Sequence, residues 1–420
     1  MSRVCATFAG TNPACIMKKL TILLFLSLSL PAFSASVIRQ AKEAIKKKQN
    51  LEATAKTLLE EAAKPETRHA KRVECYVLAA ECWNRVYEAE NMKLYLHQKY
   101  DTVKFFNSIQ QMYQLLEKAD SIEAEPNEKG KVRIRNRRGS RDMLMPFRKN
   151  LYAGGSWFFR KAQMPEALTY FQTYIDAAES PIFAAENFHH TDTLMPYVAY
   201  LAVHAANMSQ NHDAVIKYAP LALQSNIRNH IVQEYLSKAW AAKGDTTHYL
   251  EAMWEGLRTY PQYTYFYSNL IDHLIEERNY ERGLSVTDSM ITWSDTIPLF
   301  HYAKSLLLLK LHRDEEAIKA ADDCLALDSN YVDALYNKGI ASLNLAVIFS
   351  ETACTDPSNP QSIHDRQIIR SLYELARKPM ERVRQLQPEN KDRWAPLLYR
   401  IYLNLNMGKE FDEMDHILNG

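Results

Sequence analysis

The residues best suited to metal chemistry lie in the segment Glu179–Pro196. Glu186, His189, His190 and Asp192 all carry side chains that can ligate a metal ion. Their spacing does not match His-Glu-x-x-His, in which two histidines share one helix face. Adjacent histidines would also point in different directions on a helix or a strand. We therefore predict a polar loop between structural units here, and no metal site.

A second candidate segment is strongly basic. Lys129–Arg141 contains seven Lys or Arg residues, which predicts an exposed loop with a short extended strand at Val132–Arg135. Such a cluster would fit an acidic protein, a lipid headgroup or another polyanion. A solvated loop that balances the acidic stretch Glu123–Glu128 is the simpler interpretation. Nucleic acid is not expected, because no aromatic residues alternate with the basic ones. The candidate binding residues are Lys131, Arg133, Arg135, Arg137, Arg138 and Arg141.

The rest of the sequence contains no recognisable catalytic motif. It has no Gly-x-Ser-x-Gly, no Walker loop and no paired carboxylates in a catalytic context. Glycine is scarce, with 11 residues in 420, and the net charge is only +1. That charge argues against a polyelectrolyte that binds nucleic acid or membranes through its whole surface. We predict that the protein is not an enzyme and has no cofactor.

The elements that would position these segments are predicted to be repeating helices. Ala, Leu, Glu, Lys, Arg and Gln, which favour helix, are abundant. Counted back from Ala317, the residue that opens a second helix recurs at intervals of 34, 34 and 35, and longer intervals mark insertions. These positions are Ala167, Ala214, Tyr249, Gly283, Ala317, Ala376 and Met414.

Further positions repeat with the same period. Small residues would let the two helices of a unit approach closely, and large residues would fill the gap to the next unit. The small residues are Gly155, Ala202, Ser237, Ser305 and Gly339; the large ones are Tyr267, Leu335 and Trp394; and Pro261 and Pro388 close second helices. This pattern resembles the tetratricopeptide repeat (TPR), although Ile271 and Leu398 replace the small residue in two units.

The resemblance implies an all-α fold, an α-solenoid of antiparallel helix pairs wound into a right-handed superhelix. It covers residues 148–420, with insertions near 179–196 and 345–366. We interpret residues 35–147 as diverged repeats continuous with this array, including one long helical pattern at Met92–Ser121 and the basic loop 129–141. Stacking is required because one helix pair cannot bury its apolar face alone.

The resemblance also implies that first helices line a concave face on which partners lie. Tyrosine suits such a face because it buries a large area and keeps a hydroxyl, although each tyrosine could equally pack between helices. The Lys and Asn that grip a C-terminal carboxylate in the best-known version of the fold are missing, so chaperone-tail binding is not expected. The predicted partner-binding residues are Lys149, Tyr152, Arg160, Glu234, Lys238, Tyr265, Asp272, Tyr302, Lys310, Asp333 and Tyr336.

The N-terminal residues match a secretory signal. Lys18-Lys19 precede the apolar run Leu20–Leu30, and small residues surround a cleavage point before Ala35. We predict a signal peptide at 1–34, with 1–16 a start-site artefact, and a periplasmic or secreted mature chain without a transmembrane segment. The run Asn150–Gly155 in such an exported chain resembles repeat proteins of Bacteroidota-type bacteria.

Two function classes follow. The first is a non-enzymatic scaffold of the cell envelope that binds a protein or peptide through the concave face, the basic loop or both. The alternative is a sensing or carrier protein for an anionic small molecule or glycan, in which Lys149, Arg160 and the loop arginines converge on one pocket. A scaffold predicts an open groove, whereas a carrier predicts a closed cavity with convergent polar groups.

Overall fold

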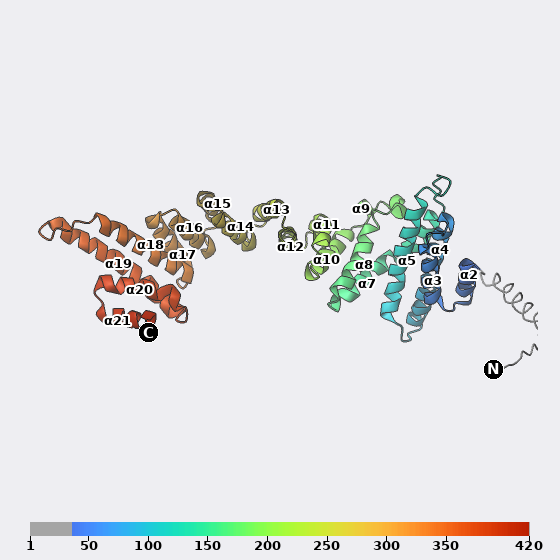
Figure 1. Cartoon of the computed structure of the whole chain (residues 1–420), viewed down its shortest axis with the longest axis horizontal. Coiled ribbons are helices and arrows are strands. Elements are labelled where there is room, and N and C mark those ends of the chain that lie inside the picture. Colours follow the sequence, from blue (N-terminus) through green and yellow to red (C-terminus); the bar gives the residue numbers. More distant parts are fainter. Residues whose placement is uncertain (1–35, 420) are drawn as a thin grey trace, which may run out of the picture. The chain divides into compact units, whose positions relative to one another are not determined.

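The computed structural model describes residues 36–419, and consecutive helices pack as antiparallel neighbours (Figure 1). Helix accounts for 79% of the structure, and no strand occurs in the described part of the chain. The predicted all-α, TPR-like solenoid of helix pairs is therefore confirmed. The predicted signal peptide lies outside the described residues. None of the helices in residues 36–419 is both long and apolar enough to cross a membrane.

The described residues form two compact units, which divide after Asp245. The first unit has a core that runs continuously from Ala41 to Ala239. The division at 147/148 drawn from the sequence thus falls inside this unit, where the diverged and regular repeats share one core. Its helices are α2 (Val37–Lys47), α3 (Leu51–Ala63), α4 (His69–Tyr95), α5 (Thr102–Glu123), α6 (Arg137–Leu144), η1 (Met145–Phe147), α7 (Arg148–Arg160), α8 (Met164–Asp176), η2 (Pro181–Glu186), α9 (Phe188–Thr191), α10 (Met195–Met208), α11 (His212–Ala222), η3 (Leu223–Ser225) and α12 (Asn229–Ala242).

The second unit continues the same pairing with clusters of its own around Phe300, Leu308 and Trp394. The insertion predicted near 345–366 forms the ends of two helices and the short loop between them. These helices, α18 and α19, are longer than the other helices of this unit. The helices are α13 (Thr246–Thr259), α14 (Thr264–Glu276), α15 (Tyr280–Trp293), α16 (Pro298–Lys310), α17 (Asp314–Leu327), α18 (Val332–Thr352), α19 (Pro360–Leu386), α20 (Lys391–Leu405) and α21 (Gly408–Asn419).

The turn within a helix pair repeats its backbone conformation along the chain. In each of these turns, a residue that follows the first helix has a positive φ. This conformation allows backbone N–H groups to bond to the last carbonyl groups of the helix, and it reverses the chain direction. This residue is a glycine only at Gly244, so the other turns hold a strained non-glycine residue. The turn residues are Lys48, His97, Ala162, Gln210, Gly244, Arg278, His312 and Asn406. The same backbone conformation occurs at Lys48 and His97 in the N-terminal region.

Close helix approach explains the small residues of the repeat. A Cβ atom added at Gly155 on α7 would lie 2.5 Å from a ring atom of Phe171 on α8, which is a clash. Gly339 on α18 has the same relation to Met380 on α19. The prediction that small residues at these positions let paired helices approach is confirmed.

One predicted helix is interrupted. The pattern from Met92 to Ser121 is divided between α4 and α5, with a turn at residues 96–101. The side chain of Asp101 accepts a hydrogen bond from Lys104 N at 2.9 Å and so caps α5. α5 buries one face in the core, whereas Met92, Leu94, Tyr95 and Leu96, at the end of α4 and in the turn, are exposed.

Candidate functional site

Four tyrosines lie on three helices of the first unit. They are Tyr152 on α7, Tyr197 and Tyr200 on α10, and Tyr235 on α12, and we call them the tyrosine row. The rings of Tyr152 and Tyr197 are 6.4 Å apart, and those of Tyr197 and Tyr200 are 6.2 Å apart. All four are half-buried, so each ring packs on its neighbours and still reaches solvent.

His204 continues the row on α10. Its ring lies 5.8 Å from that of Tyr235, whose hydroxyl is 3.4 Å from His204 Nδ1. Burial lowers the pKa of His204 below its ordinary value, with a smaller contribution from Arg228. Tyr197, Tyr200 and His204 are spaced i, i+3 and i+7, which places them on one helix face. This spacing is visible in the sequence, but of the tyrosine row only Tyr152 is among the predicted partner-binding residues.

The other predicted residues of the first unit divide between surface and interior. Lys149 and Arg160 are exposed on α7. Glu234, in contrast, is only 9% exposed and accepts a hydrogen bond from Lys238 Nζ at 2.5 Å. The expectation that Glu234 faces a partner is corrected, because its carboxylate lies inside the helix packing and pairs with Lys238.

In the second unit, internal contacts occupy much of the predicted face. Arg393 on α20 pairs with Asp333 at 2.5 Å, and its guanidinium lies 4.4 Å from the ring centre of Tyr336. The ring of Tyr302 packs 5.3 Å from that of Tyr331. Arg393 was not predicted, because it follows Asp333 by 60 residues and no local pattern links them.

The remaining predicted residues of this unit do not gather at one point. Tyr265 packs edge-on against Phe266 at 5.4 Å. Asp272 and Lys310 are exposed on different helices, α14 and α16. Burial, assisted by the nearby charge of Glu276, raises the pKa of Asp272 above its usual value.

The basic segment is part loop and part helix. Arg137, Arg138 and Arg141 lie on α6, which corrects the prediction of a loop that continues to residue 141. Arg137 donates two hydrogen bonds to the buried carboxylate of Asp120, at 2.8 and 2.9 Å, and so fixes α6 against α5. Arg141 contacts Asp142 at 2.8 Å and Glu186 at 3.8 Å. Arg137 and Arg141 therefore serve the fold, whereas the side chain of Arg138 is 88% exposed and lies 4.0 Å from Asp142.

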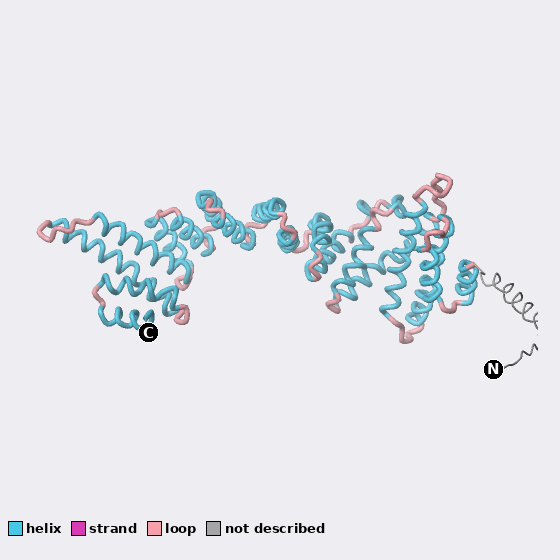
Figure 2. Tube along the Cα trace, viewed as in Figure 1, coloured by secondary structure: helices cyan, strands magenta, loops and turns pink. Residues whose placement is uncertain are grey.

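Lys131, Arg133 and Arg135 remain exposed in the loop between α5 and α6, which projects beyond the helix ends (Figure 2). The extended strand predicted at Val132–Arg135 is absent, because no second strand lies beside this segment within residues 36–419. The loop is nevertheless held at its end by Glu123, whose carboxylate accepts hydrogen bonds from Arg135 N and Asn136 N at 3.0 Å each.

A surface cavity of about 630 Å³ lies between this loop and α4. Its walls mix both signs of charge, including His69, Glu74, Glu128, Arg133 and Arg135. Lys149 and Arg160 are not part of its lining, so the convergence expected for an anion carrier does not occur there. The cavity is open to the surface, and its mixed charges do not favour a purely anionic ligand.

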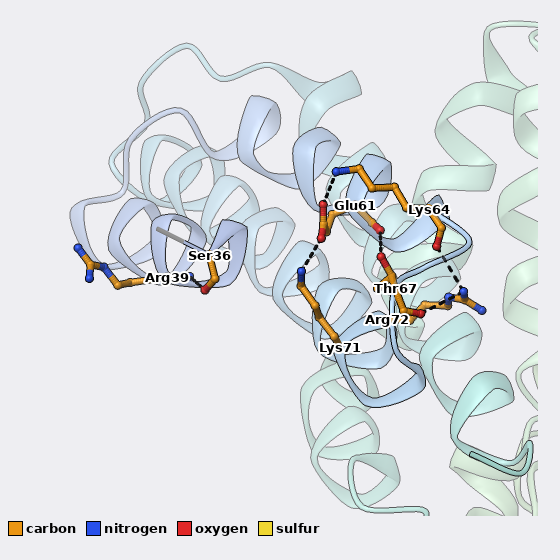
Figure 3. Close-up of polar contacts among 7 residues, drawn as sticks. All are labelled: Ser36, Arg39, Glu61, Lys64, Thr67, Lys71 and Arg72. Atoms are coloured by element: carbon orange, nitrogen blue, oxygen red, sulfur yellow. Dashed lines mark hydrogen bonds and ion pairs between the residues drawn. The ribbon is translucent and has the colours of Figure 1, made fainter. Parts of the chain in front are cut away.

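The turn before α4, which places His69 at this cavity, is fixed by polar contacts around Glu61 (Figure 3). The Glu61 carboxylate accepts hydrogen bonds from Lys64 at 2.6 Å and from Lys71. These hydrogen bonds, that of Lys64 first, lower the pKa of Glu61 against the opposing effect of burial. Thr67 Oγ1 donates to Glu61 O at 2.7 Å, and Arg72 donates to Thr67 O at 3.3 Å. These contacts hold the turn, although the buried Nε of Arg72 has no hydrogen-bond partner in the described residues.

The four metal-capable residues of the segment at 179–196 do not converge. Asp192 pairs with the buried Arg148, and His189 contacts Glu179 at 2.7 Å. No group of three or more His, Cys, Asp or Glu side chains suited to a metal ion occurs in residues 36–419. The segment forms η2 and α9, so it is a folded connection that packs on α7 and α8.

Comparison with known proteins finds similar solved structures of low sequence identity and low TM-score. No family model and no curated protein matches the sequence. The C-terminal part of a TPR repeat-containing protein from Cytophaga hutchinsonii is 10% identical, with 63% of this chain and 98% of that chain covered and a TM-score of 0.36. A TPR repeats protein from Bacteroides fragilis is 11% identical, with coverages of 64% and 98% and a TM-score of 0.29. A monomeric IFIT1 mutant solved with Gppp-AAAA is 12% identical, with coverages of 88% and 73% and a TM-score of 0.36. Likenesses of this size do not identify a family for the chain.

Proposed function

We propose that this protein is a non-enzymatic scaffold of the cell envelope that binds a protein or peptide on the first-helix face of its first unit. The tyrosine row supports this proposal. Its half-buried rings are held in place before a partner arrives. Tyr197 contacts the rings of Tyr152 and Tyr200, and Tyr235 contacts the ring of His204. Rigid aromatic side chains bury a large area at low entropic cost, which makes them effective anchors for recognition.

The alternative, a carrier for an anionic small molecule or glycan, is not favoured by the cavity at the basic loop. That cavity contains the carboxylates of Glu74, Glu123 and Glu128 beside Arg133 and Arg135. A small anion enclosed in this cavity would contact the carboxylates as well as the arginines, so the lining does not form a purely basic pocket. The location in the envelope is supported by the signal pattern of residues 18–35. Export of a reporter fused behind residues 17–40 tests it.

A peptide selection tests the binding proposal. The chain from Ser36 is immobilised and a displayed library of random 12-residue peptides is selected against it. We expect enriched peptides whose affinity falls at least about tenfold when Tyr197 and Tyr200 are both changed to serine, which corresponds to about 1.4 kcal/mol. A matched control changes Tyr95, which is 77% exposed on α4, to serine and leaves affinity unchanged.

The folding of each variant is checked by circular dichroism before binding is measured. A library that yields no enriched peptide would contradict the proposal. So would peptides that bind the double variant as tightly as they bind the original chain.

A further inference from the structure

The loop between α5 and α6 contains a strand-like sequence without a strand beside it. Residues Lys131–Arg135 read Lys-Val-Arg-Ile-Arg, in which basic and β-branched residues alternate. This alternation is typical of a β-strand with one apolar and one polar face. The structure shows neither helix, turn nor bend from Lys131 to Arg135.

The backbone of this segment is open. Within residues 36–419, no hydrogen bond joins the N–H or C=O groups of Val132, Arg133 or Ile134 to another residue. Val132 is 51% exposed and Ile134 is 40% exposed, so both apolar side chains are accessible to a partner. An open row of donors and acceptors is what an edge strand offers to an added strand.

Both ends of the segment are held by side chains. On the N-terminal side, Asn127 Oδ1 accepts hydrogen bonds from Lys129 N at 2.9 Å and Lys131 N at 3.2 Å, and Asn127 N donates to Lys131 O at 3.1 Å. On the C-terminal side, the buried Glu123 accepts from Arg135 N and Asn136 N. Val132–Ile134 therefore lie between two fixed ends of the loop. Because the ends are fixed, less conformational entropy is lost when a partner binds.

The side chains indicate which partner fits. In a straight segment, Arg133 and Arg135 lie on one side and Val132 and Ile134 on the other. Arg133 and Arg135 line the cavity against α4, which Glu74, Glu123 and Glu128 also line. Ile134 lines a second depression beside Pro181 and Ile182, and Arg135 reaches this one too. No carboxylate lies within ion-pair distance of Arg133 or Arg135 in the described residues, although other arginines of the segment are paired.

We propose that Lys131–Arg135 is a β-augmentation site: an extended peptide in which acidic and apolar residues alternate adds as a strand along it. Its backbone pairs with that of Val132–Ile134. Its acidic side chains meet Arg133 and Arg135, and its apolar ones meet Val132 and Ile134, as cross-strand neighbours do. This site is separate from the tyrosine row, so an experiment can refute either proposal without refuting the other.

The test uses the chain from Ser36 and a fluorescent octapeptide with four Glu-Val repeats. We expect saturable binding below about 1 mM by fluorescence anisotropy, weakened at least about tenfold by Arg133→Ser with Arg135→Ser. The control Lys46→Ser with Lys47→Ser removes two exposed charges from α2 and leaves binding unchanged. Tyr197→Ser with Tyr200→Ser also leaves it unchanged, which separates this site from the proposed function.

Two further probes separate strand addition from simple charge attraction. A Glu-Val octapeptide methylated on alternate backbone nitrogens keeps its charge but loses its donors, and we expect it to bind at least about tenfold more weakly. A Lys-Val octapeptide is expected not to bind. Absence of Glu-Val binding, or equal binding of the methylated peptide, overturns the proposal. Binding to vesicles of anionic lipid that equals or exceeds peptide binding also overturns it, because a membrane surface would then be the better partner.

Discussion

Removal of the carboxylate of Asp192 is expected to release the segment from η2 to α9. Arg148 is only 7% exposed, and its guanidinium lies between the rings of Tyr174 and Phe188, at 3.9 and 3.8 Å from their centres. Asp192 neutralises it and also accepts hydrogen bonds from Tyr174 Oη at 2.7 Å and Leu194 N at 2.9 Å. Asp192→Ala would leave a buried cation without its counter-charge.

The expected cost follows from this burial. Breaking a buried ion pair by removing one partner costs about 3 to 5 kcal/mol, because the remaining charge stays desolvated. Arg148 keeps its hydrogen bond to Tyr174 O at 3.2 Å and both ring contacts, so we expect the lower end of that range. About 3 kcal/mol corresponds to a rise of more than 100-fold in the opening equilibrium.

Hydrogen–deuterium exchange of peptides from residues 181–196 measures this opening. The double variant Arg148→Met with Asp192→Ala removes both charges and fills the space between the rings, so we expect it to exchange more slowly than Asp192→Ala alone. Asp213→Ala breaks an exposed ion pair with Lys243 and serves as the control, with no measurable effect. The reasoning is refuted if Asp192→Ala exchanges within about threefold of the original chain, or if the double variant is the less protected of the two.

The same contacts predict a pH dependence. Burial alone would raise the pKa of Asp192, but the hydrogen bonds from Tyr174 and Arg148 and the charge of Arg148 outweigh it, so the pKa lies below its usual value. A carboxyl group that is more acidic when folded stabilises fully above its unfolded pKa of about 3.9. Its contribution is lost as the pH falls through the folded pKa. Protection of residues 181–196 should therefore decline below about pH 4 in the original chain, and this decline should be absent in Asp192→Ala.

Three more predictions follow from packing and burial. Gly155→Ala is expected to destabilise the first unit by about 1 to 3 kcal/mol in urea unfolding, because its Cβ would meet Phe171. The control Gly139→Ala, with open space around its Cβ, should not destabilise and should favour α6. Burial, and secondarily a neighbouring carboxylate, raises the pKa of Glu117 to about 7, above its unfolded value of about 4.3, so stability should fall as pH rises between these values. Glu117→Gln should abolish that fall and be the more stable form at pH 8 in urea unfolding. In the folded chain, mass spectrometry after brief alkylation should find Cys354 labelled first, because the thiols of Cys75, Cys82 and Cys324 are buried with raised pKa values.

The features that the sequence predicted well are those with local causes. Gly155 and Gly339 are small because a partner helix, close in sequence, passes against them, and a fixed spacing reveals that need. The pairing of Arg393 with Asp333 has no such signature. This pairing depends on which helices become neighbours after stacking. Sequence spacing therefore could not predict that Arg393 lies over the ring of Tyr336.

The strand expected at Val132–Arg135 shows a different limit. The alternation of side chains predicted a strand, and the prediction was wrong because a strand requires a partner backbone as well as a pattern. The structure supplies anchors at Asn127 and Glu123 and no partner, so the segment stays open. A local pattern indicates what a segment can form, and only the surrounding fold determines whether it forms within the chain.

The contrast between the two units favours the first as the place where partners bind. A peptide on the first helices of the second unit would have to compete with Arg393, which neutralises Asp333 and covers Tyr336. Each tyrosine of the row in the first unit is supported by another ring or by His204, and none gives up an ion pair when a partner arrives. The binding free energy is what remains of the new contacts after the cost of breaking contacts already present. Two surfaces with the same number of tyrosines can therefore bind a partner with different affinities. The first unit therefore offers two separate surfaces, one aromatic and one with an open backbone, that a partner can cover at little internal cost.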